Sequence, residues 1–222
     1  MRIPQLTLCA LFATLIAGPA LADNDSNRKG GNNECPVGLV KGLTLDEEFG
    51  PGAQELTRCL KKRHNVKMVV QINQLCASPA TATTAATCSK PYALGNIANI
   101  LDDYEITHGM KVGRDYELVA VVHNGGGTLM LKNESYNKAG VLLSDRNKFE
   151  TDVKALMERG VKFYFCQNTT RGYITNGTLP DFQTDGAGRS ATGQMIDGVQ
   201  FSTAGLTSIA DFEALGYAYI QP

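Results

Sequence analysis

The clearest fold signal is Val161-Lys162-Phe163-Tyr164-Phe165, followed directly by Cys166-Gln167-Asn168-Thr169-Thr170-Arg171-Gly172. The first five residues form a short apolar run with β-branched and aromatic side chains, a composition typical of a buried strand. Polar residues and a glycine then end the run, so Cys166 is expected at the tip of that strand. Two similar runs, 67–73 and 116–122, come earlier in the chain.

Helical patterns alternate with these strands. Apolar residues recur at helical spacing from Leu94 to Tyr104 and from 149 to 157, and Ser208 is expected to cap a helix over 208–215 that Gly216 ends. Further strands are expected at 198–202 and 217–220. This alternation predicts an α/β fold of three layers, α/β/α, around a mostly parallel five-stranded sheet. Ligands bind such sheets at the carboxyl ends of the strands, where Asn73, His123 and Cys166 fall.

The N-terminus has the pattern of an export signal over 1–22: Arg2, an apolar run, and an Ala-x-Ala site at the end. The apolar run is too short for a spanning helix, so we expect a periplasmic or secreted protein with no membrane attachment after cleavage. Residues 23–65 are expected to form a flexible arm and an N-terminal extension, with a helical pattern at 54–62. Residues 66–222 then form the α/β domain.

Cleavage would leave 222 − 22 = 200 residues with five cysteines. An odd number in an exported protein indicates paired cysteines and one left over. Proximity favours Cys35–Cys59 and Cys76–Cys88, although four cysteines allow three arrangements. There is no Cys-x-x-Cys, and the histidines His64, His108 and His123 are scattered, so neither a metal nor another cofactor is expected. No basic block indicates a nucleic-acid partner.

Cys166 is the candidate for chemistry. Backbone N–H groups after the strand, and Arg171 nearby, would stabilise a thiolate, which is the reactive form. The alternative is a buried cysteine that only packs as a small apolar residue. His123 is either an acid/base group or a structural histidine that bonds to the loop after it. That loop, Gly125-Gly126-Gly127-Thr128, has free N–H groups suited to an anion.

Several blocks together carry a family resemblance: Val69 to Asn73, Ala93 to Leu101, Val121-Val122-His123, Gly160 to Phe163 with Cys166 to Thr169, and Gly216 to Pro222. In this order the chain, from about Val66 onward, resembles the DsrE/DsrF-like family of sulfur-relay proteins. The resemblance implies a compact three-layer α/β fold, a homo-oligomer, and a cysteine at the position of Cys166 that receives and passes sulfane sulfur as a persulfide. Fold alone does not fix function.

These patterns lead to the expectation of a periplasmic sulfur-binding or sulfur-transfer protein, either a sulfurtransferase or a carrier. Its partners would be a sulfane-sulfur donor and an acceptor. Cys166 and His123 are the expected catalytic pair, and substrate-binding groups are expected at Asn73, Asn124, Asn168, Thr169 and Arg171. The alternative is a non-catalytic binding module with the same fold. A thiol–disulfide oxidoreductase is disfavoured because Cys166 has no close sequence partner. The stretch from Thr170 to Asp197 is expected to be a long loop with a short helix at most, which shields Cys166.

Overall fold

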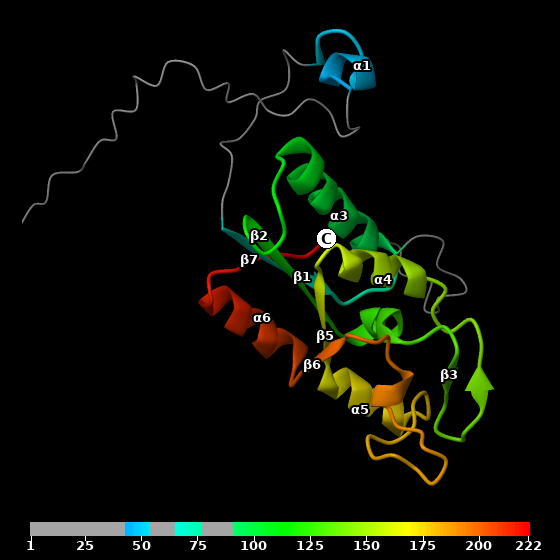
Figure 1. Ribbon diagram of the computed structural model, residues 1–222. Helices are drawn as coiled ribbons and strands as arrows, with labels where there is room; N and C mark the ends of the chain where they lie inside the picture. The colour runs from blue at the N-terminus through cyan, green and yellow to red at the C-terminus, as the bar shows by residue number, and fades with distance from the viewer. Residues whose placement is uncertain (1–42, 54–64, 77–90) are drawn as a thin grey trace, which may run out of the picture. The chain divides into compact units, whose positions relative to one another are not determined.

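The computed structural model describes residues 43–53, 65–76 and 91–222 (Figure 1). The expected signal segment and the helical pattern at 54–62 lie outside these residues. The short helix α1 (Leu45–Phe49) was not expected from the sequence. It begins with a capping box, in which the Glu47 amide donates to Thr44 Oγ1 at 3.2 Å and the Thr44 amide donates to Glu47 Oε2 at 2.7 Å.

The predicted five-stranded sheet is confirmed, and all of its strand pairs are parallel. It consists of β1 (Val66–Ile72), β2 (Tyr116–Val122), β5 (Lys162–Cys166), β6 (Gln200–Ser202) and β7 (Ala218–Ile220), in the order β6-β5-β2-β1-β7. The central strands are apolar on both faces because both faces are covered, as in other parallel sheets. Val69, Val70, Phe163 and Phe165 are all fully buried.

Helices cover the two faces of the sheet and complete the three-layer α/β/α fold (Figure 1). The main core brings together α3 (Tyr92–Asp102), α4 (Glu150–Glu158) and one face of the strands. A smaller cluster joins α6 (Gly205–Ala214) to the other face through Ile209 and Phe212. Right-handed crossovers explain this division. From β1 through β2 and β5 to β6 the chain moves along the sheet in one direction, so the connecting helices cover one face. From β6 to β7 it returns in the opposite direction, so α6 covers the other face.

The stretch after Cys166 contains a short helix, α5 (Gln167–Thr175), for which the sequence analysis left room. Thr170 is fully buried on this helix and donates its hydroxyl to the Cys166 carbonyl at 3.1 Å. The expected cap at Ser208 is also wrong. Helix α6 begins three residues earlier, and the Ser208 hydroxyl lies inside it, donating to the Ala204 carbonyl at 2.7 Å. Gly216 does follow the helix, with a positive φ of 86°.

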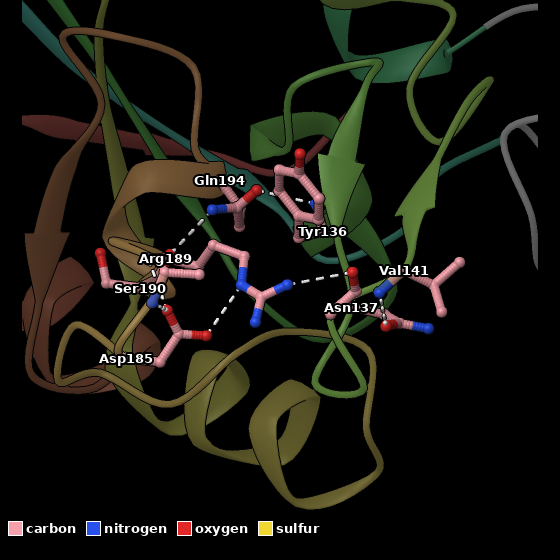
Figure 2. A network of polar contacts seen from close by, with 9 residues as sticks. Tyr136, Asn137, Val141, Asp185, Arg189, Ser190 and Gln194 are labelled. Atoms are coloured by element: carbon pink, nitrogen blue, oxygen red, sulfur yellow. Dashed lines mark hydrogen bonds and ion pairs between the residues drawn. The ribbon is translucent and has the colours of Figure 1, made fainter.

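The remaining elements are short: η1 (Asp103–Thr107), which is a π-helix, the 3₁₀ helices η2 (Asn124–Met130) and η3 (Thr192–Gln194), and a hairpin of β3 (Ser135–Tyr136) and β4 (Leu142–Leu143). Figure 2 shows how the loop after α5 is tied to this hairpin. Arg189 donates to Asp185 at 2.8 Å and to the Gly140 carbonyl at 3.0 Å, while Gln194 Oε1 accepts from the Tyr136 amide at 2.8 Å. The loop is therefore fastened to the hairpin.

Candidate functional site

A cavity of about 520 Å³ opens at the carboxyl end of β5, where α5 and α6 begin. The chain leaves β5 toward the main core and leaves β6 toward the opposite face, so this is a point where the connections diverge. Crevices form at such points in parallel sheets. The described lining residues are His123, Asn124, Cys166, Asn168, Thr169, Gly172, Tyr173, Asn176, Ala204, Gly205, Leu206 and Thr207.

Cys166 is a free cysteine with 4% of its surface exposed. It is the last residue of β5 and the N-cap of α5, so its sulfur lies next to the positive end of that helix. The amide of Gly205, the first residue of α6, donates to Cys166 Sγ at 3.2 Å. The sulfur therefore accepts one backbone N–H group, from α6, and belongs to the residue that precedes the first turn of α5.

Close packing requires glycine at position 205. A Cβ atom there would lie 2.9 Å from both Cγ and Cδ2 of the His123 ring. Because the ring and the Gly205 backbone are in contact, the position of His123 limits where the amide donor to Cys166 can lie.

His123 follows β2 and has 6% of its surface exposed. Its Nε2 lies 2.6 Å from Gln71 Nε2, and the Gln71 side-chain oxygen accepts from the Tyr219 hydroxyl. Burial lowers the pKa of His123, and a hydrogen bond with the Asn124 side chain partly opposes that shift. A neutral ring is favoured, with Gln71 donating to Nε2. Among the described residues its side-chain partners are Gln71 and Asn124, and a direct bond to Cys166 is not among them.

The segment after His123 packs tightly against β1 and α5. Asn124 adopts a left-handed conformation with φ of 48°, and its amide donates to Thr169 Oγ1 at 3.0 Å. Gly126 and Gly127 are buried, and a Cβ on Gly126 would lie 2.5 Å from the Ile72 carbonyl oxygen. Packing thus accounts for these glycines, which the sequence had suggested as an anion-binding loop.

The structure brings five of the expected site residues together around one cavity: Cys166, His123, Asn124, Asn168 and Thr169. It does not place Asn73 or Arg171 among the described lining residues. Arg171 is exposed and donates to Asn168 Oδ1 at 3.0 Å. Its link to the cavity is therefore indirect, through the side chain of Asn168, which is a lining residue. Of the segment 170–197 that was expected to shield Cys166, the described lining residues are Gly172, Tyr173 and Asn176, which lie on α5 or at its end.

Sequence reasoning missed Gly205, Tyr173 and Gln71. Gly205 lies 39 residues from Cys166, so no local pattern reports their contact. Gln71 offered a weak signal, since a glutamine inside an apolar strand needs a partner when buried. Its partners are His123 and Tyr219.

Cys76 is buried and disulfide-bonded, whereas Cys166 is free. The partner of Cys76 therefore lies outside the described residues, as do Cys35, Cys59 and Cys88. Both expected pairings stay predictions. Within residues 43–53, 65–76 and 91–222, no group of three or more His, Cys, Asp or Glu side chains is arranged to hold a metal ion. No helix in this part of the chain is both long and apolar enough to span a membrane.

Comparison with solved structures finds similarity in fold. No protein-family model matches the chain, and no curated protein matches it. A solved structure, that of the protein of unknown function MTH1491 from Methanobacterium thermoautotrophicum, is 18% identical, covers 71% of this chain and 100% of its own, and superposes with a TM-score of 0.44.

Proposed function

We propose that this chain is a periplasmic sulfur-binding or sulfur-transfer protein that carries sulfane sulfur as a persulfide on Cys166. One observation carries the proposal: a free cysteine at a strand tip whose sulfur accepts the first amide of α6 beside a cavity of about 520 Å³. The resemblance of the sequence to DsrE/DsrF-like proteins supports it. The disulfide at Cys76 supports export, because such bonds persist in oxidising compartments.

The chemistry needs no cofactor. The Cys166 thiolate attacks the outer sulfur of a donor R–S–SH, the donor S–S bond breaks, and R–S⁻ leaves. The Cys166 side chain is then a persulfide, Cys–S–SH, which has gained one sulfur atom. The single negative charge has moved to the leaving group, R–S⁻. Delivery reverses these roles, because an acceptor thiolate takes the outer sulfur and releases the Cys166 thiolate. No external oxidant or reductant is consumed.

The residues of the cavity have distinct roles in this proposal. The amide of Gly205 stabilises the thiolate, which is both nucleophile and leaving group. Asn124, Asn168 and Thr169 offer amide and hydroxyl groups to a bound sulfur compound. His123 holds Gly205 in place by contact and is a positioning residue.

Mass spectrometry tests the proposal directly. Native protein incubated with inorganic polysulfide is expected to gain sulfur on the peptide that contains Cys166, and Cys166→Ser is expected to lose that adduct. A low-molecular-weight thiol added afterwards should remove the sulfur. If the native protein gains no sulfur over a range of pH and donors while its denatured form reacts, the relay proposal is wrong.

A non-catalytic binding module is the second candidate. It is favoured by the burial of Cys166, which is 4% exposed, and by the two neutral amides that engage His123. In that case the cavity captures a ligand and the thiol only packs. Complete protection of Cys166 from both iodoacetamide and a bulky maleimide, with no sulfur adduct, would support this function over sulfur transfer.

A further inference from the structure

A second cavity, of about 510 Å³, lies between α3, η1 and the end of β7. It shares no described lining residue with the cavity at Cys166. Its volume is in the range that holds small organic ligands. The described lining residues are Met68, Tyr92, Asn96, Asn99, Ile100, Asp103, Tyr104, His108, Met110, Ile220 and Pro222.

The wall of this second cavity is largely apolar. Ile100 and Ile220 lie beside the buried side chains of Met68, Tyr104 and Met110. Such a surface favours a flat or bulky apolar body, which would release water from the wall on binding. Asn96 and Asn99 add neutral polar groups from α3.

The π-helix η1 fixes the charge at one side of this cavity. Three carboxylates lie at or next to it: Asp102, Asp103 and Glu105. Arg159 pairs with both Asp102 and Glu105 at 2.8 Å, and Tyr116 donates its hydroxyl to Glu105 at 2.5 Å. These contacts hold the segment from the other side, so this wall of the cavity is fixed before a ligand binds. π-helical turns are rare and often occur at functional sites.

Asp103 is the carboxylate that remains available to a ligand. Its side chain is 50% exposed, and its ion-pair partner in the part of the chain that the structure describes is His108, whose Nε2 lies 3.5 Å from Oδ2. No lysine or arginine is among the described lining residues. The tyrosine rings of Tyr92 and Tyr104 also suit a cation, because their faces carry partial negative charge.

We infer that this second cavity is a binding site for a small apolar molecule that carries a protonated amine. The amine pairs with Asp103, and the apolar body lies against Ile100, Met110 and Ile220. This site is independent of the sulfur chemistry proposed for Cys166. It gives the protein a ligand-binding function at the cavity between α3, η1 and the end of β7.

Tryptamine is a suitable probe, and indole-3-acetate has the same ring with the opposite charge. Isothermal titration of the protein is expected to show saturable binding of tryptamine. Indole-3-acetate should bind at least about tenfold more weakly, and Asp103→Asn should weaken tryptamine binding by about tenfold, since a hydrogen bond to a charged group is lost. Ile100→Trp should weaken tryptamine binding by narrowing the cavity.

Two controls separate this site from the rest of the protein. Asp211→Asn removes an exposed carboxylate from α6 and should leave tryptamine affinity unchanged. Cys166→Ser should also bind tryptamine normally, even if it fails to take up sulfur. The inference is overturned if no saturable binding of tryptamine or phenethylamine occurs at millimolar concentration. It is overturned equally if folded Asp103→Asn binds as the wild type does, or if indole-3-acetate binds as well as tryptamine.

Discussion

Substituting Gly205 by alanine tests the link between the α6 N-terminus and the sulfur. The added Cβ would lie 2.9 Å from the His123 ring, whereas ordinary contact begins at 3.4 Å, so the two groups must separate by 3.4 − 2.9 = 0.5 Å. His123 is held by Gln71 and Asn124. The start of α6 therefore gives way, and the amide donor moves from its 3.2 Å contact with Cys166 Sγ.

The expected loss follows from the strength of that bond. A hydrogen bond to a charged group is worth about 1.5–3 kcal/mol, and its lower limit corresponds to roughly a tenfold change. Gly205→Ala should therefore slow the reaction of Cys166 with iodoacetamide, and its loading by polysulfide, by about tenfold. Crowding costs about 1–3 kcal/mol of folding stability.

The assay is alkylation kinetics at fixed pH, with circular dichroism and urea unfolding as checks on the fold. Gly186→Ala is the matched control, because a Cβ at Gly186 meets no atom within 4 Å and its φ is not positive. It should react as the wild type does. Wild-type rates in a folded Gly205→Ala protein would refute the assignment of the Gly205 amide as the group that stabilises the thiolate.

Three further predictions concern stability and local order. Because burial lowers the pKa of His123, the unfolded chain binds a proton at higher pH than the folded protein does. The stability that His123 contributes is therefore present above its unfolded pKa of about 6.5 and is lost as the pH falls below that value. Thermal unfolding of His123→Gln should depend less on pH in that range. Asn147 is fully buried and donates to the carbonyls of Leu129 at 2.8 Å and Leu131 at 2.9 Å, so Asn147→Ala should lower the free energy of unfolding by about 3 kcal/mol in urea titrations. Arg189→Gln should speed hydrogen exchange across the hairpin 135–143, while the free energy of global unfolding changes by no more than about 1 kcal/mol, as for other partly exposed pairs; unchanged exchange would show that Arg189 does not hold the hairpin.

The sheet could be predicted because its strands are buried on both faces and read as apolar runs. The strands over 66–72, 116–122 and 162–166 need no tertiary information, since few soluble loops contain such runs. Sequence spacing also located α3 and α4, because each presents one apolar side to the sheet.

Helix α5 could not be predicted with the same ease. Its sequence, Gln167 to Thr175, contains three threonines and a glycine, which are poor helix formers. The helix is stabilised by packing instead. Thr170 is buried, and the ring of Tyr173 lies 6.2 Å from that of Phe165 on β5. Tertiary contacts therefore override local propensity here, and the same helix supplies one of the two N-termini at Cys166.

The candidate site could be predicted only in part, for a related reason. Residues at the carboxyl ends of strands, such as His123 and Cys166, share one edge of a parallel sheet, so the sequence places them together. The residue that bonds to the sulfur comes from a helix that starts after a different strand, β6. Strand order decides whether that helix arrives near Cys166, and a single sequence does not report strand order.

Strand order also explains why the reactive group would be placed beside β6 and not beside β1. At β1 and β2 the chain leaves toward the same face, and His123, which follows β2, lies beside Gln71 of β1. Between β5 and β6 the chain leaves toward opposite faces, and the N-termini of α5 and α6 remain on either side of an opening. A cysteine at the end of β5 therefore accepts an N–H group from α6 and borders the cavity.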